Sequence, residues 1–270
     1  MSTTTKIDFI YLSEQDMIRA GVTDMLACVD TMEEMFGLLY IGDYRMAGPN
    51  NDSHGAMVIF PKESPFPNMP KPTADRRMMA MPAYLGGNFC TAGVKWYGSN
   101  IANRDKGLPR SILMFTLNDP DTGAPLAHMS ANLLSAYRTG AIPGVGARHL
   151  ARKDAKVVGL LGPGVMGKTT LAAFIAVCPQ IDTLKIKGRG EKSLNDFIAW
   201  VKQTYPQVTT IKVVDTLEDV VRDADLVTYC SSGEVGDPSN YPIVKREWVK
   251  PGAFMAMPAS CSLDEGMESS

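Results

Sequence analysis

A glycine-rich segment at residues 162–169, GPGVMGKT, constrains this chain more than any other feature of its sequence. It follows the apolar run 157–161 and precedes the apolar, alanine-rich run 171–176, which is the order expected for a strand, a tight turn and a helix. The first turn of a helix carries unpaired N–H groups and the positive end of the helix dipole, and glycine lets an anion approach the main chain closely. The segment therefore predicts a phosphate-binding turn.

Two nucleotide-binding motifs share this segment. Gly162, Gly164 and Gly167 fit G-x-G-x-x-G, which is typical of dinucleotide-binding domains. Extended to Lys168 and Thr169, the same residues fit G-x-x-x-x-G-K-T, the P-loop that binds ATP or GTP. The turn alone leaves both ligands open.

The surrounding sequence favours the dinucleotide. A P-loop enzyme needs an acidic residue after a neighbouring apolar strand to hold Mg²⁺, and the candidate, Asp215, follows a run that Lys212 interrupts. A dinucleotide domain needs a ribose-reading residue about 20 positions after the glycines. That stretch is basic where an acidic residue would bind the ribose of NAD, so it suits the 2′-phosphate of NADP; its cations are Lys187, Arg189 and Lys192.

Bulk properties are those of a globular protein. The 270 residues, 45% hydrophobic and 21% charged, allow one large domain or two modest ones, and we expect two. The net charge of −2 and the lack of a basic block interleaved with aromatics give no reason to expect a nucleic-acid partner.

The sequence gives no reason to expect a membrane partner either. It has no apolar run of about 18 residues and begins with a polar segment, so we expect a cytoplasmic protein. Its 5 cysteines are scattered without C-x-x-C spacing, and it has 3 histidines, so we expect reduced thiols and no metal site.

The first half of the chain is predicted to have an α+β fold. We expect a strand over 7–12, a short helix capped by Ser13 and a second helix over 25–41. Alternating apolar runs then predict a mostly antiparallel sheet, with strands at 56–60, 78–85, 91–97, 111–118 and 124–129. A long helix over 131–150, bent or broken at Pro143, would join the two halves.

From residue 156 onward strands and helices alternate. Short strands are predicted at 157–161, 183–187, 210–214, 226–229 and 253–257. Helices are predicted between the first four, near 169–177, 192–204 and 217–221. Such alternation predicts an α/β fold with a doubly wound parallel sheet, in which the glycine turn opens the first crossover.

A series of further motifs resembles the ornithine cyclodeaminase/mu-crystallin family. They are MPAYL at 81–85, GVK at 93–95, GLP at 107–109, DPDTGAPL at 119–126, LSAYRTGA at 134–141 and ARHLAR at 147–152. The resemblance runs from about residue 11 to 259 and resolves the nucleotide question in favour of a dinucleotide. It implies an N-terminal substrate-binding and dimerisation domain over 1–130, a connecting helix over 131–152 and an NAD(P)-binding Rossmann domain over 153–270.

The resemblance also implies chemistry. Family members move a hydride at a carbon bonded to nitrogen, and Arg45, Lys95 and Arg138 would gather round the carboxylate of an amino or imino acid, with Lys95 also exchanging a proton at nitrogen. Each cation also has a structural explanation that involves no ligand. Arg45 could form a surface ion pair, Lys95 could occupy a solvent-facing strand position, and Arg138 could cap its helix or form an ion pair. The predicted cofactor-binding residues are Thr139, Gly162, Gly164, Val165, Met166, Gly167, Lys187, Arg189, Lys192 and Ser231.

The chain departs from the family after the fifth strand of the second half. Cyclodeaminases carry an acid/base aspartate there, whereas this chain has Ser260 or Cys261 at that place, and Asp264 could reach it only if the turn were rearranged. Cys261 is thus a second catalytic candidate beside Lys95, and cyclisation of ornithine is in doubt. The resemblance further implies a return strand and helix beyond the last residue of this sequence.

The sequence as a whole predicts an NADP(H)-preferring oxidoreductase, with NAD possible, that acts on the C–N bond of an amino or imino acid as a homodimer. A cyclodeaminase, a non-catalytic small-molecule binder and a P-loop ATPase are the alternatives.

Overall fold

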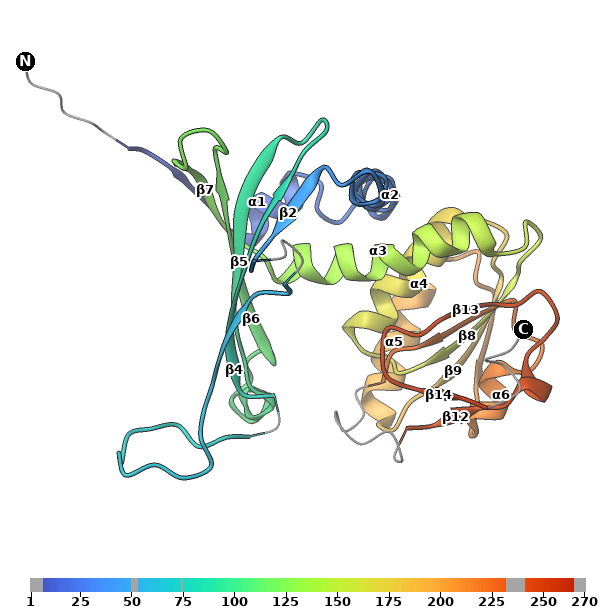
Figure 1. Ribbon diagram of the computed structural model, residues 1–270. Helices are drawn as coiled ribbons and strands as arrows, with labels where there is room; N and C mark the ends of the chain where they lie inside the picture. Colours follow the sequence, from blue (N-terminus) through green and yellow to red (C-terminus); the bar gives the residue numbers. More distant parts are fainter. Residues whose placement is uncertain (1–6, 50–52, 74, 232–240, 265–270) are drawn as a thin grey trace, which may run out of the picture. The chain divides into compact units, whose positions relative to one another are not determined.

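The computed structural model describes residues 7–49, 53–73, 75–231 and 241–264. The chain divides into two compact units, each built on its own sheet (Figure 1). The first unit comprises residues 1–23 and 34–135, and the second comprises 24–33 and 136–270. Helices α2 (Met25–Ile41) and α3 (Asn132–Leu150) each contribute residues to both units.

The first unit contains a seven-stranded mixed sheet in the order β1-β7-β6-β5-β4-β2, with β3 also paired to β4. The predicted antiparallel run is confirmed, and β1 joins its edge by pairing in parallel with β7. The strands are β1 (Ile10–Leu12), β2 (Tyr44–Met46), β3 (Ala56–Ile59), β4 (Arg77–Leu85), β5 (Thr91–Ser99), β6 (Ser111–Asn118) and β7 (Pro125–Ser130).

One face of this sheet packs on helix α1 (Glu14–Arg19). Met17 of α1 lies against Ala127 and Met129 of β7, which gives the unit a small apolar core. The predicted cap is confirmed, because the Ser13 hydroxyl accepts from the N–H of Asp16 in a capping box that starts α1. The short 3₁₀ helix η1 (Ile101–Lys106) between β5 and β6 was not predicted.

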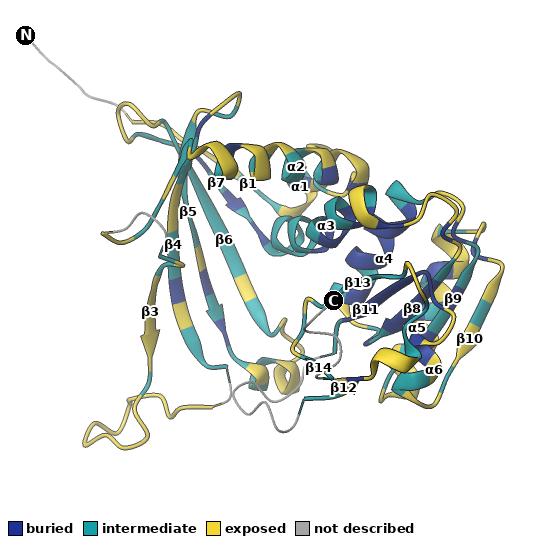
Figure 2. Ribbon diagram, turned by 45° about the vertical axis from the view of Figure 1, so that its right-hand side comes forward, coloured by how far each residue is buried: buried dark blue, intermediate teal, exposed yellow. Residues whose placement is uncertain are grey.

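The second unit contains a five-stranded parallel sheet in the order β10-β9-β8-β11-β13. Numbered within the unit this is 3-2-1-4-5, the doubly wound order, so the predicted α/β fold is confirmed. The central strands and α4 are largely buried (Figure 2). The elements are β8 (Val157–Leu161), α4 (Val165–Val177), β9 (Thr183–Lys187), α5 (Glu191–Thr204), β10 (Thr210–Val213), α6 (Leu217–Val221), β11 (Leu226–Tyr229) and β13 (Phe254–Ala256).

Three short elements near the C-terminus were not predicted. Strands β12 (Ile243–Val244) and β14 (Ser262–Leu263) pair in parallel, and η3 (Arg246–Trp248) follows β12. Each is only two or three residues long, too short to show a periodic pattern.

Helix α3 was predicted to be bent or broken at Pro143; it is continuous through this residue, so it is not broken there. Close packing on neighbouring helices offsets the hydrogen bond that proline cannot donate. A Cβ at Gly144 would lie 2.8 Å from Val29 Cγ2 of α2 and 2.9 Å from Ala173 Cβ of α4, so the helix fits at this point only with glycine.

A buried carboxylate ties together the amino ends of three strands of the parallel sheet. Asp225 is 6% exposed, and its Oδ2 accepts from the N–H groups of Lys156 and Val157 at 2.9 and 3.0 Å. Its Oδ1 accepts from Lys250 Nζ at 2.5 Å, and its main-chain carbonyl accepts from the N–H of Phe254 at 2.9 Å. Because β8, β11 and β13 begin here, Asp225 fixes where all three enter the sheet.

The charge of Asp225 makes this network sensitive to pH. Burial acts to raise the pKa of Asp225, but the Lys250 ammonium and the two main-chain N–H groups outweigh burial and hold that pKa below its ordinary value. A carboxyl with a lowered pKa in the folded state stabilises the fold above its unfolded pKa of about 3.9 and loses that contribution as the pH falls through the folded pKa.

We predict that Asp225→Ala lowers the free energy of unfolding by about 2 kcal/mol at neutral pH, because two N–H groups and an ammonium lose their acceptor. In urea denaturation followed by circular dichroism, the difference from wild type should shrink as the pH is lowered below about 4. Asp154→Ala, which removes an exposed partner of Arg152, is the control and should leave the midpoint nearly unchanged. A deficit for Asp225→Ala that does not vary with pH would contradict the role of its charge.

Candidate functional site

The three motif glycines fill three different geometric requirements at the turn after β8. Gly162 has φ +102°, and a Cβ there would lie 2.6 Å from the Ser231 nitrogen at the end of β11. A Cβ at Gly167 would lie 2.4 Å from the Gly162 carbonyl oxygen, so the turn and α4 pack closely. Gly164, the N-cap residue of α4, would meet nothing within 4 Å. Open space therefore lies next to the main chain where α4 begins.

The P-loop alternative does not fit this turn. Helix α4 already begins at Val165, so Lys168 and Thr169 lie inside it, and the N–H of Lys168 donates to the Gly164 carbonyl at 3.0 Å. The Thr169 hydroxyl is buried and donates to the Val165 carbonyl at 3.2 Å, where a P-loop would aim it at Mg²⁺. Lys168 Nζ lies 5.1 Å from the centre of the Trp200 ring. The turn has the geometry of a dinucleotide fingerprint.

Helix α3 passes close to the first turns of α4. A Cβ at Gly140 would lie 2.4 Å from Thr169 Cβ, so the two helices are in contact there. Arg138 and Thr139 precede Gly140 directly and are half-buried. The structure thus places Thr139, predicted to bind the cofactor, beside the contact with α4, and Ser231 next to Gly162.

Arg138 lies near the start of α2. Burial raises the pKa of the Cys28 thiol on α2, and the positive charge of Arg138 acts in the opposite direction. Cys28 and Arg138 therefore lie near each other within the second unit.

The three cations of the β9–α5 segment have different surroundings. Lys187 donates to the main-chain carbonyl of Asp215, and Lys192 pairs with Asp196 one helical turn along α5 at 2.6 Å. Arg189 is exposed and lies next to Gly188, where a Cβ would be 2.6 Å from Pro163 Cγ. Arg189 is therefore one residue from a direct contact with the glycine turn.

Lys95 and Arg45 lie in the first unit, on opposite faces of its sheet. Lys95 is central in β5, opposite Met81 of β4, and its Nζ is 5.0 Å from the centre of the Tyr97 ring. Arg45 of β2 is opposite Tyr84 of β4. Directly opposed residues share a face and successive residues alternate, so the odd separation of Met81 and Tyr84 puts Arg45 and Lys95 on different faces.

Arg45 is also engaged locally. It is exposed and donates to the main-chain carbonyls of Gly42 and Tyr44, at 3.1 and 2.5 Å. The strand register therefore puts Arg45 and Lys95 on different faces, a property that sequence spacing across a long connection does not reveal. Their gathering round one carboxylate stays a prediction.

The acidic side chain and the thiol in the segment after β13 have different surroundings. Asp264 Oδ2 accepts from the N–H of Arg246 at 3.0 Å and so helps to hold η3. Cys261 is half-buried before β14, and burial raises the pKa of its thiol, which favours the protonated form.

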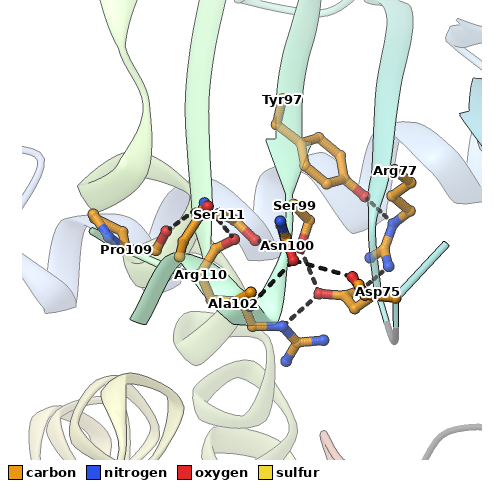
Figure 3. Close-up of polar contacts among 11 residues, drawn as sticks. Asp75, Arg77, Tyr97, Ser99, Asn100, Ala102, Pro109, Arg110 and Ser111 are labelled. Atoms are coloured by element: carbon orange, nitrogen blue, oxygen red, sulfur yellow. Dashed lines mark hydrogen bonds and ion pairs between the residues drawn. The ribbon is translucent and has the colours of Figure 1, made fainter. Parts of the chain in front are cut away.

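A polar cluster that sequence reasoning missed lies at one end of the first sheet (Figure 3). Asp75, with φ +68° and a side chain 9% exposed, pairs with Arg77 and Arg110 and accepts from the Ser99 hydroxyl. Arg77 Nε also donates to the Tyr97 hydroxyl at 3.3 Å. In the sequence, the cluster is indicated only by three consecutive charged residues, Asp-Arg-Arg at 75–77, at the start of a mostly apolar strand.

The described part of the chain has neither a metal-binding cluster nor a membrane-spanning helix. No group of three or more His, Cys, Asp or Glu side chains there could hold a metal ion. No helix in the same residues has the length and apolar character needed to span a bilayer.

Relatives of known activity match most of this chain. The N-((2S)-2-amino-2-carboxyethyl)-L-glutamate dehydrogenase of Staphylococcus aureus is 26% identical over 92% of this chain and 68% of its own length. The alanine dehydrogenase of Archaeoglobus fulgidus is 35% identical over 66% of this chain and 51% of its own length. The chain thus spans about half to two thirds of these relatives.

Solved structures show the same fold. The Thermococcus litoralis Delta(1)-pyrroline-2-carboxylate reductase in complex with NADH and L-proline matches with a TM-score of 0.74 and 26% identity, over 92% of this chain and 68% of the other. An archaeal alanine dehydrogenase dimer with bound NAD matches with a TM-score of 0.71 and 29% identity, over 92% and 66% of the two chains.

The family model for ornithine cyclodeaminase/mu-crystallin proteins matches residues 21–269, which confirms the resemblance carried by the motifs. The relatives named above are dehydrogenases and a reductase, and two of their structures hold NAD or NADH. The chain belongs to the ornithine cyclodeaminase/mu-crystallin family, and the relatives named above are enzymes.

Proposed function

We propose that the chain is an NAD(P)H-dependent oxidoreductase acting on the C–N bond of an amino or imino acid. The observation that carries this proposal is the geometry of the glycine turn, where open space at Gly164 adjoins the first N–H groups of α4. Those groups, at Val165 to Gly167, suit the pyrophosphate of a dinucleotide. The dehydrogenases and the reductase among the relatives support the reaction type.

We propose that Lys95 and Arg138 bind the substrate carboxylate, as the family resemblance implies. An arginine can bind a carboxylate through two parallel hydrogen bonds, and a lysine adds a compact charge. A bound nicotinamide supplies or accepts the hydride at carbon. Lys95 then gives a proton to the nitrogen or removes one, and Cys261, whose pKa is raised, would act only as a donor.

We propose that Arg189 reads a 2′-phosphate, which would make NADP the preferred cofactor. Its position beside the contact between Gly188 and Pro163 supports this choice over the other two cations. Lys187 and Lys192 are the further candidates for the same contact. The structures cited above hold NAD or NADH, so NAD remains the alternative.

We propose that the protein is a homodimer joined through the outer face of the first sheet, the face opposite α1. The strand registers place six apolar side chains there, each between 41% and 62% exposed: Tyr11, Val58, Met78, Trp96, Ile112 and Leu126. Exposed apolar side chains gathered on one face are typical of an interface. Sedimentation equilibrium should give twice the chain mass of 29.3 kDa, and a monomer at that mass would refute the dimer.

We predict that Gly164→Ala weakens binding of NADPH and NADH at least tenfold without lowering the unfolding temperature. The added methyl group meets no protein atom and instead occupies space that the pyrophosphate needs. Gly37→Ala, at a helical glycine whose Cβ also meets nothing, is the matched control and should bind both cofactors normally. Fluorescence titration measures both, and normal binding by Gly164→Ala would move the cofactor away from this turn.

We predict that wild type binds NADPH more tightly than NADH or ATP and that Arg189→Ser removes the preference. The change should raise the Kd for NADPH by about tenfold or more, because a charge-assisted contact is lost, and leave that for NADH unchanged. Lys202→Ser, at the far end of α5, is the control. Tighter binding of NADH by wild type would assign the protein to NAD.

The reaction itself is tested with a panel of substrates. Wild type should oxidise NAD(P)H when given a cyclic imino acid, or a 2-oxo acid with ammonia, and Lys95→Gln should lower kcat by about 100-fold or more because proton transfer is lost. Proline and ammonia formed from ornithine without net cofactor turnover would indicate a cyclodeaminase. Tight cofactor binding with no turnover on any substrate would indicate a binding protein.

A further inference from the structure

Two cations and an aromatic ring lie in a row on the α1 side of the first sheet. Arg77 of β4 is directly opposite Ser99 of β5. Lys95 and Tyr97 lie four and two positions before Ser99, and alternate residues of a strand share a face. Lys95, Tyr97 and Arg77 are therefore on the same face, the one opposite to Arg45.

Tyr97 contacts both cations and limits their separation. Lys95 Nζ is 5.0 Å and Arg77 Cζ is 5.7 Å from the centre of the Tyr97 ring, so the two charges are at most about 11 Å apart. The ring is held in place, because its hydroxyl accepts from Arg77 Nε at 3.3 Å and donates to Met79 Sδ at 3.1 Å. Figure 3 shows the tyrosine hydroxyl directed at the guanidinium of Arg77.

Asp75 fixes Arg77 without neutralising the cluster. Its carboxylate is shared between Arg77 and Arg110, so two positive charges meet one negative charge (Figure 3). Asp75 adopts φ +68°, in the left-handed region that aspartate enters more readily than most residues with a side chain. Arg77 keeps its side chain 32% exposed, and its second terminal nitrogen, Nη2, has no hydrogen-bond partner among the described residues.

This arrangement suits a second acidic group on the substrate. Two carboxylate contacts of about 3 Å each, one at Lys95 and one at Arg77, leave up to about 5 Å between the two carboxylates of a ligand, which is the span of a short dicarboxylic acid. A guanidinium already fixed by Asp75 and Tyr97 loses little entropy when it binds such a group.

We propose that Arg77 is a specificity-determining residue that binds a side-chain carboxylate, so that the substrates are dicarboxylic amino or imino acids. Asp75 is the positioning residue that aims Arg77. This inference rests on the proposed function and adds the class of substrate to it.

The test measures kcat/KM in the reductive direction, with NADPH, ammonia and either oxaloacetate and 2-oxoglutarate or pyruvate. Wild type should prefer the two dicarboxylic acids, and Arg77→Gln should lower kcat/KM for them by about 10- to 100-fold while leaving pyruvate within about twofold. Arg76→Gln is the matched control, because the neighbouring Arg76 donates to the carbonyl of Lys71 and is not part of the row. Asp75→Asn should shift the same ratio, mainly through KM.

The outcomes separate the two levels of the proposal. Equal use of pyruvate and the dicarboxylic acids by wild type, or an equal loss on all three in Arg77→Gln, would overturn the role of Arg77 and leave the oxidoreductase intact. No turnover with any 2-oxo or imino acid would overturn the oxidoreductase and this inference with it. If Arg77→Gln does not fold, competitive inhibition of wild type by glutarate but not by butyrate supports the proposal, and equal inhibition by both refutes it.

Discussion

The close approach of main chain to main chain at the glycine turn is the constraint on which the second unit depends. The carbonyl of Gly162 lies so near Gly167, and the nitrogen of Ser231 so near Gly162, that a Cβ at either glycine would collide. This contact lets α4 start three residues after β8, with its first N–H groups next to the open space at Gly164. The same contact puts Ser231, which follows β11, at the edge of the turn. The close packing of this helix N-terminus on two strand ends stabilises the unit, and the unpaired N–H groups of the same helix end suit an anion.

The two ends of the parallel sheet differ in what they do: the amino ends of the strands carry a stabilising network, and the carboxyl ends carry the proposed cofactor site. Asp225 anchors the amino ends of β8, β11 and β13 with a buried charge that is fully engaged by Lys250 and two N–H groups. The glycine turn lies beyond the carboxyl end of β8, where open α/β sheets bind their ligands. The acid that holds the strands is therefore at the end of the sheet away from the proposed cofactor, so its protonation affects the fold without competing for the ligand.

Local patterns predicted the second unit well, because its strands are fully buried and its helices alternate with them. The bounds of β8, β9, β11 and α6 were predicted to the residue. The start of α4 was placed four residues late, because the glycines that make the turn look like a loop although Gly167 lies within the helix. Strands β12 and β14 were not predicted, because each has only two residues.

In the first unit, the strand register and the Asp75 cluster could not be predicted from a single sequence. Spacing within β5 correctly placed Lys95 in an apolar strand, but the face that Arg45 shares depends on which residue of β4 it opposes, and that register is set through a long connection. The Asp75 cluster brings together residues 35 positions apart at strand ends, where no periodicity exists to reveal it. Charged residues in such places are usually solvated, so only the three-dimensional arrangement distinguishes a cation aimed by a buried acid from one that faces water. The register of β4 places Arg77, and not Arg45, on the sheet face of Lys95, and the contact with Asp75 then holds the Arg77 side chain there.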